Sequence, residues 1–296
     1  MDMATIKALN SRFDESKTTR ENEQGEGTMR IFWQSFIDAT ASAAYMLKLS
    51  DYLNGIAEPG TTVEVFGIRP PDRHFGRLAE FRCAAIAIDN GLEAEKRGYD
   101  AIVLGHFQDP GLYELKSAVS IPVIGAGEVS MHYAARFGRR IALVTLDDVF
   151  QTWHYEQADL YGLGGRVKHV AGMNCAPSDF SAAFAGDDEA RTRMLAAFAA
   201  CAEPLVRDGA DVVVPAGILP GLLVGGEYGF KVLHAPVVNT AAVTLKSAEM
   251  DVRLRKLNGI DVSRGPFCSL ATPEAVKDFR SFIAHGRQAP LFPDDV

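Results

Sequence analysis

From residue 29 onward, short apolar runs alternate with longer segments in which apolar residues recur every three or four positions. The short runs predict buried β-strands, and the longer segments predict amphipathic helices. The predicted strands cover 29–35, 62–68, 101–105, 121–125, 140–145, 166–171, 211–215 and 235–238. The predicted helices cover 40–57, 77–97, 110–118, 128–137, 149–161, 187–208, 218–226, 239–256 and 272–285. Wholly apolar strands that alternate with helices are typical of parallel sheets flanked by helices.

Three segments recur in the same order, roughly 110 residues apart. RIFWQS is followed by YDAIVLGHF and IPVIGAGEV, and RIALVT is followed by ADVVVPAGI and APVVNTAAV. The repeat predicts an α/β protein with two pseudosymmetric domains, each a parallel sheet flanked by helices, and an active site in the cleft between them. We expect the first domain to comprise 29–125 plus 239–296, and the second 126–238. The polar residues 1–28 are expected to form a flexible extension.

Charge and composition exclude several classes of partner. The 296 residues carry a net charge of −8 and contain no block of Lys or Arg, which argues against nucleic acid and anionic membranes. No apolar run reaches the ~18 residues of a membrane span, and the first residues lack the apolar core of a secretory signal. The cysteines are scattered without CxxC spacing, which indicates reduced thiols and a cytoplasmic location. They are Cys83, Cys175, Cys201 and Cys268.

Two positions stand out at the predicted strand ends, where ligands of open parallel sheets bind. His106 follows the strand at 101–105, and Gly217 holds the equivalent place in the second half. An imidazole titrates near neutral pH and can act as a general acid or base. The alternatives are a histidine that only hydrogen-bonds its loop, or a metal ligand that converges with other histidines. These are His74, His132 and His154, but the chain has no HxxxH spacing, and we expect no metal.

Three segments resemble the aspartate/glutamate/hydantoin racemase superfamily, with the hydantoin racemase branch as the nearest match. They are DAIVLGHFQDPGLYELKSAVSIPVIGAGEVSMHYAARFGRRIALVT, GADVVVPAGILPGLL and APVVNTAAVTLKSAEM, and the likeness covers roughly residues 29–258. The resemblance implies two pseudosymmetric α/β domains, no cofactor, and a small carboxylate or cyclic amide bound between them. It also implies that one cysteine removes a proton next to a carbonyl, and that a second cysteine on the opposite face returns it.

The chain departs from this family at both catalytic positions. His106 stands where the resemblance implies the first cysteine, and Gly217 where it implies the second. The two-thiol mechanism therefore does not transfer. Glu128, which begins a helix after a strand end, is the candidate replacement for the second acid or base, so we predict His106 and Glu128 as the catalytic residues. A carboxylate there is equally well explained as a charge partner of the helix N-terminus.

Residues near the other strand ends complete the predicted site, because hydroxyl, amide and backbone N–H groups there can bind a substrate. The predicted substrate-binding residues are Gln34, Ser35, Phe107, Thr145, Ala216, Gly217 and Ile218. The loop at 67–76, with Arg69, Arg73 and His74, either attracts an anionic substrate or is a solvated connector. Trp153 and Tyr155 either wall the pocket or pack in the core.

We therefore predict a cofactor-independent isomerase that transfers a proton next to a carbonyl without a thiol, on a small anionic or cyclic-amide substrate. One alternative is a hydrolase, lyase or decarboxylase of the same fold in which His106 activates water or moves a proton. Another is an inactive relative that only binds a small molecule. The segment Gly125-Ala126-Gly127 is not a dinucleotide fingerprint, because Ser130 replaces the third glycine. Helix-rich surfaces also lead us to expect a homo-oligomer.

Overall fold

The computed structural model describes residues 28–37, 42–69 and 75–285. The predicted extension at 1–28 therefore lies almost entirely outside the described residues. Among the described residues, no helix has the length and apolar character needed to cross a membrane.

The chain forms two parallel sheets of closely related topology. The first has the order β2 (Thr61–Phe66), β1 (Met29–Ser35), β3 (Ala101–Gly105), β4 (Val123–Gly125). The second has the order β6 (Val167–Gly172), β5 (Ile141–Thr145), β7 (Val212–Ala216). A parallel bridge from Val213 to Val237 continues this second sheet at the place that β4 takes in the first. The predicted α/β fold with an internal repeat is confirmed.

The predicted strand at 235–238 is divided between two pairings. Ala235–Pro236 forms β9, which pairs antiparallel with β8 (Lys231–Val232), and only Val237 bridges to the second sheet. A further difference from the sequence prediction is a helical segment that precedes α8 (Asp188–Arg207). It consists of the 3-10 turn η2 (Pro177–Phe180) and the short helix α7 (Ser181–Phe184).

Helices cover the faces of both sheets because their apolar residues recur on one side. In α3 (Arg77–Lys96), for example, the buried positions repeat every three or four residues. The remaining helical elements are α2 (Ala43–Ile56), α4 (Leu112–Lys116), α5 (Ala126–Ala134), η1 (Asp148–Phe150), α6 (Gln151–Leu160), α9 (Ile218–Gly225), α10 (Thr240–Asn258) and α11 (Pro273–His285).

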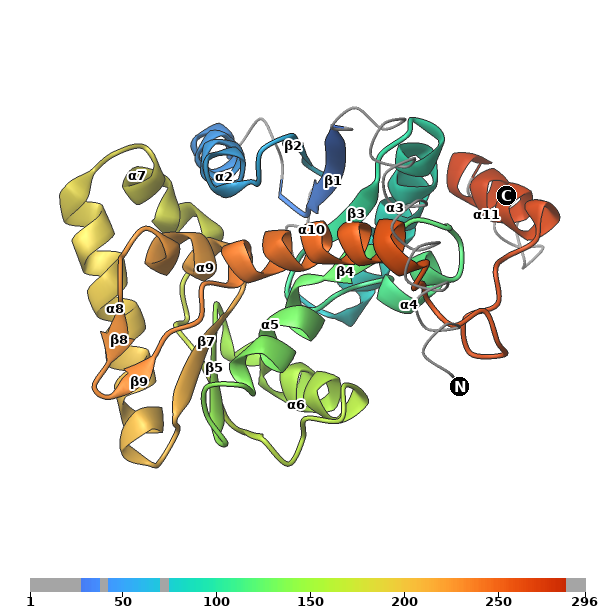
Figure 1. Cartoon of the computed structure of the whole chain (residues 1–296). Helices are drawn as coiled ribbons and strands as arrows, with labels where there is room; N and C mark the ends of the chain where they lie inside the picture. Colours follow the sequence, from blue (N-terminus) through green and yellow to red (C-terminus); the bar gives the residue numbers. More distant parts are fainter. Residues whose placement is uncertain (1–27, 38–41, 70–74, 286–296) are drawn as a thin grey trace, which may run out of the picture.

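Helix α10 runs across the middle of the molecule (Figure 1) and joins the two halves. Its buried residues Ala241 and Leu245 belong to one apolar cluster with Trp33 of β1 and Leu222 of α9. Because this core contains residues from both halves, it holds the carboxyl ends of the two sheets in a fixed relation.

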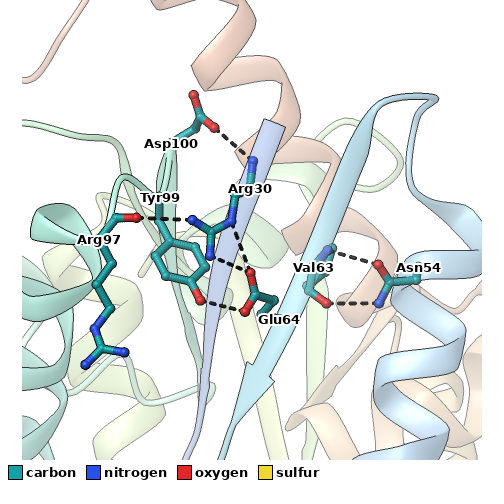
Figure 2. Close-up of polar contacts among 7 residues, drawn as sticks. All are labelled: Arg30, Asn54, Val63, Glu64, Arg97, Tyr99 and Asp100. Carbon is teal, nitrogen blue, oxygen red and sulfur yellow. Dashed lines mark hydrogen bonds and ion pairs between the residues drawn. The ribbon is translucent and has the colours of Figure 1, made fainter. Parts of the chain in front are cut away.

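Polar side chains fix the amino end of the first sheet (Figure 2). The backbone N–H of Arg30 donates to Asp100 at 2.8 Å, and its guanidinium donates to Glu64 at 2.8 Å. The other oxygen of Glu64 accepts from the Tyr99 hydroxyl at 2.8 Å. This network connects β1, β2 and the start of β3 at the end of the sheet opposite to the strand ends where the candidate residues lie. It therefore offers control positions for mutations at the site.

Candidate active site

The carboxyl ends of β1, β3, β5 and β7 meet at one cavity of about 60 Å³. His106, which follows β3, and Gly217, which follows β7, both line it. Strand register explains the meeting, because Ser35 pairs with Gly105 in the first sheet and Thr145 pairs with Ala216 in the second. Since one water needs about 10–15 Å³ on this measure, the cavity suits only a compact ligand.

Gly105 allows β3 to approach β1 closely at the cavity. A Cβ atom at this position would lie 2.1 Å from Nε1 of the buried Trp33 indole. Such a distance is far inside van der Waals contact, so any side chain would push the strand end away. The glycine therefore sets the place from which His106 enters the cavity.

Two of the contacts of His106 orient its ring. Its Nε2 lies 2.8 Å from Oε1 of Glu80 in α3, and its ring stacks on Phe36 with centroids 4.8 Å apart. The carboxylate only accepts, so Nε2 carries the hydrogen and Nδ1 is the basic nitrogen of the neutral ring. A carboxylate in this position also stabilises the imidazolium that forms when the ring takes up a proton.

Glu80 is the main residue that the sequence analysis missed. It is 1% exposed, and its second oxygen has no hydrogen-bond partner among the described residues. A buried carboxylate without compensation is costly, and the contact with His106 offsets part of this cost for Glu80. The sequence contains a signal, because Glu80 falls in the buried stripe of α3 with Cys83, Ala84 and Ala87.

The first turn of α9 supplies backbone donors on the Gly217 side of the cavity. Ile218 and Leu219 line the same cavity, and their N–H groups have no acceptor within the helix. Pro220 has no N–H, and the amide of Gly221 donates to the Gly217 carbonyl at 3.0 Å. The amides of Ile218 and Leu219 are therefore candidate donors to a ligand oxygen.

Ser35 contributes a buried hydroxyl to the cavity wall. Among the described residues, its Oγ has no hydrogen-bond partner of normal geometry. The neighbouring Tyr45 phenol is also buried, and burial raises its pKa above the ordinary value, although the nearby Ser35 opposes the shift. Tyr45 therefore stays protonated and acts as a donor, while the Ser35 hydroxyl can bond to a ligand.

Thr145 holds the equivalent place at the end of β5, and its hydroxyl is partnered. Its Oγ1 lies 3.2 Å from Nε2 of His154, and Nδ1 of His154 lies 3.0 Å from Oε1 of Gln157. His154 and Gln157 belong to α6 and are both buried. Burial lowers the pKa of His154 to about 4, against the opposing effect of the Gln157 hydrogen bond, so the ring is neutral near pH 7.

The structure separates the predicted site residues into two groups. Six of them line the cavity, namely Ser35, His106, Thr145, Ala216, Gly217 and Ile218. Three do not, namely Gln34, Phe107 and Glu128. Gln34 is buried in the first half, where its amide donates to the Ser35 carbonyl at 2.8 Å and accepts from Asn90 at 2.8 Å. Phe107 is fully buried in the core of the second sheet.

Glu128 lies at a different hollow, where its carboxylate forms an ion pair with Lys116 at 2.7 Å. Its backbone N–H and that of Gly127 donate to the Asp109 carboxylate, which caps the start of α5. Glu128 thus does lie at a helix start, but its side chain pairs with Lys116. We therefore leave Glu128 out of the proposed catalytic group.

The aromatic wall of the cavity comes from Phe75 and Phe150, whose ring centroids are 5.0 Å apart. Of the two rings for which a wall or a packing role was open, Trp153 packs against the guanidinium of Arg77, and neither Trp153 nor Tyr155 is among the lining residues. In the predicted covering loop, Arg69 is exposed. Arg73 and His74 lie outside the described residues.

Among the described residues we find no candidate group for thiol or metal chemistry at the cavity. None of the four cysteines lines the cavity. Burial raises the pKa of the Cys175 thiol to about 11 and also raises that of Cys201, which disfavours the reactive thiolate. Within 28–37, 42–69 and 75–285, no three His, Cys, Asp or Glu side chains are grouped as metal ligands.

His154 makes the stability of the fold depend on pH. The unfolded chain binds a proton at this imidazole below about pH 6.5, whereas the folded protein binds it only below about pH 4. The stabilisation that depends on a neutral His154 is fully present above pH 6.5. As the pH falls to 4, the free energy of unfolding decreases by about 3 kcal/mol. We expect urea unfolding of His154→Gln to show a shallower loss between these pH values than the wild type. If the free energy of unfolding depended on pH equally in both proteins, His154 would not be the source of this pH dependence.

Comparisons with known proteins identify the family of this chain. A family model described as Asp/Glu/Hydantoin racemase matches residues 36–217. A hydantoin racemase from Pseudomonas sp. (strain NS671) is 27% identical over 164 residues, which is 55% of this chain and 63% of that relative. The match thus spans less than two thirds of the relative's length.

Solved structures share the fold. Allantoin racemase from Klebsiella pneumoniae aligns with a TM-score of 0.65 at 20% identity, over 82% of this chain and 94% of its own. Allantoin racemase from Pseudomonas fluorescens aligns with a TM-score of 0.66 at 21% identity, over 83% and 98%. A glutamate racemase from Bacillus anthracis aligns with a TM-score of 0.53 at 16% identity, over 81% and 86%.

Proposed function

The chain belongs to the Asp/Glu/hydantoin racemase family, and from this premise we propose that it is an isomerase-type enzyme without a catalytic thiol. It moves a proton at a carbon next to a carbonyl group of a small carboxylate or cyclic amide. One observation carries the proposal: His106, bonded to the buried carboxylate of Glu80, shares a cavity with the first turn of α9.

His106 is the proposed acid-base residue. Its Nδ1 takes the proton from the carbon, and Glu80 stabilises the resulting imidazolium through Nε2 at 2.8 Å. Glu80 is a positioning residue, because it acts through the imidazole. Tyr45 also lines the cavity, but burial raises the pKa of its phenol, which disfavours the phenolate that a base would require.

Negative charge on the carbonyl oxygen is stabilised on the opposite side. The N–H groups of Ile218 and Leu219 and the hydroxyl of Ser35 are the proposed donors to the enolate oxygen. Donors that are already in place stabilise the charge without reorganisation during the reaction. Their proximity to His106 therefore favours enolate formation.

Gly217 has no side chain that could return a proton from the second face. One base on one face supports exchange or isomerisation more directly than inversion at the carbon. The same arrangement supports the first alternative, in which His106 assists hydrolysis, decarboxylation or elimination. The inactive binding relative is the second alternative, because neither His106 nor Gly217, which stand where the resemblance implies the two cysteines, is a thiol.

Proton exchange with solvent tests the proposed reaction. The protein is incubated with hydantoin, and separately with glutamate and aspartate, in deuterium oxide near pH 7. Proton NMR follows the signal of the hydrogen on the carbon next to the carbonyl. We expect one of these compounds to lose this signal faster than in a matched sample without protein, with no ring opening or carbon dioxide release. Product formation without exchange would support the lyase or hydrolase, and binding without either change would support the inactive relative.

A further inference from the structure

We infer that His154, a buried residue outside the cavity lining, fixes Thr145 as a hydrogen-bond acceptor and so selects ligands that present an N–H group beside their carbonyl. This inference deepens the proposed function, since it rests on the same cavity being the ligand site. It assigns a specificity role to a side chain that is not among the lining residues.

The chain of hydrogen bonds begins at Gln157, whose amide has a single consistent orientation. Its nitrogen lies 2.6 Å from the carbonyl oxygen of Phe107 and 3.3 Å from Oδ2 of Asp109. The carbonyl only accepts, and the Asp109 carboxylate already receives the backbone amides of Gly127 and Glu128 and the Tyr161 hydroxyl. The Oε1 atom of Gln157 is therefore the one that faces His154.

The orientation of Gln157 determines the tautomer of His154. Oε1 accepts, so the nitrogen 3.0 Å away, Nδ1, carries the hydrogen. Complete burial keeps this ring neutral at pH 7, which leaves a lone pair on Nε2. The hydroxyl of Thr145, 3.2 Å from Nε2, must then donate its only hydrogen to His154.

The bond to His154 fixes the hydrogen-bonding role that Thr145 can play toward a ligand. Once its hydrogen is given to His154, the Thr145 oxygen offers only lone pairs to any other group that contacts it. At the equivalent strand end of the first half, the Ser35 hydroxyl has no hydrogen-bond partner of normal geometry among the described residues, so its hydrogen is available to a ligand. One wall can thus donate while the other only accepts, which matches the C=O and N–H of an amide.

Charge decides between an amide and an amino acid, whose ammonium group also carries N–H. The described lining residues include no carboxylate, and the wall contains apolar groups such as Phe36, Phe150 and Leu219. A buried ammonium without a counter-ion is costly. A neutral ring amide satisfies both hydroxyls without bringing a charge into the cavity.

Two five-membered rings of equal size test the inference through binding alone. 2-Pyrrolidinone has an N–H where γ-butyrolactone has an oxygen, and both keep the carbonyl. We expect the wild type to bind the lactam about tenfold more tightly, which corresponds to one hydrogen bond. Dissociation constants are measured by NMR titration. Equal affinities, or no binding of either ring, would overturn the inference.

Three variants separate the role of His154 from general packing. In Thr145→Val the ratio of the lactam affinity to the lactone affinity should fall to about one, whereas Thr145→Ser should keep the wild-type ratio. In His154→Phe the Thr145 hydroxyl loses its acceptor and can donate, so the preference should also fall while the total affinity for the lactone rises. If His154→Phe does not fold, the threonine pair alone decides, and a preference that persists in Thr145→Val would refute the assignment. Because no step needs turnover, failed deuterium exchange would count against the proposed reaction only.

Discussion

Replacement of His106 by glutamine is expected to slow deuterium exchange of the substrate by about 10²–10⁴-fold, the usual contribution of a general acid or base. Glutamine is similar in length and polar, so it can take the place of the imidazole beside Phe36. It cannot accept a proton near pH 7, so only the proton transfer is lost. The exchange rate is followed by proton NMR, and the melting temperature is recorded to confirm folding. A variant that keeps at least half of the wild-type rate would refute the role of this imidazole.

Glu80 provides the second arm of this experiment. Glu80→Gln keeps an acceptor for Nε2 of His106 but removes the negative charge, so we expect kcat to fall about 10- to 100-fold while KM changes little. The matched control is Glu64→Gln in the network at the amino end of the sheet (Figure 2). That variant should lose some stability and retain the wild-type kcat. Equal losses of kcat in both variants would indicate a general effect on folding.

The second large effect is a gain of function. We expect the double variant His106→Cys, Gly217→Cys to racemise a chiral 5-substituted hydantoin that the wild type and both single variants leave optically unchanged. The two positions follow equivalent strands and line one cavity. A thiol at position 217 would also stand at the N-terminus of α9, which favours the thiolate. Polarimetry measures the result.

The backbone at position 217 accepts a side chain. Its φ of 166° is extended, and a new Cβ would lie 3.1 Å from Cδ of Pro220, so the proline ring must move slightly. Gly217→Ala is the control for this crowding and should fold with nearly unchanged stability. A folded double variant without optical activity loss would show that the two thiols do not face opposite sides of the bound carbon.

The fold was predictable because the apolar runs that form the strands are buried on both faces. β3 and β7, for example, are fully buried along their length, so their sequences are apolar throughout. The start of α5 was placed two residues late because its cap is Asp109, which is distant in sequence and supplies acceptors to Gly127 and Glu128. Local patterns do not reveal a cap that comes from another strand end.

The site was predictable only where topology alone determines position. His106 and Gly217 follow equivalent strands, so the repeat was enough to bring them together. Glu80 was missed because its place in the buried stripe of α3 does not by itself reveal the partner, His106, that lies on another element. Glu128 lies apart from the cavity because a residue at a helix start has several directions open to it, and its partner, Lys116, lies on another helix.

The difference between Ser35 and Thr145 has a stereochemical consequence. A cavity with true twofold symmetry would accept a flat ring in either of two orientations, and both faces of its carbon would be offered equally to the base. Here the hydroxyl at one strand end is free to donate and the one at the other end is bonded to His154. A ring bound as we propose would be held in a single orientation, and His106 would meet only one enantiotopic face. On this proposal the duplicated halves discriminate between the two faces, so that labelled product should carry deuterium with one configuration.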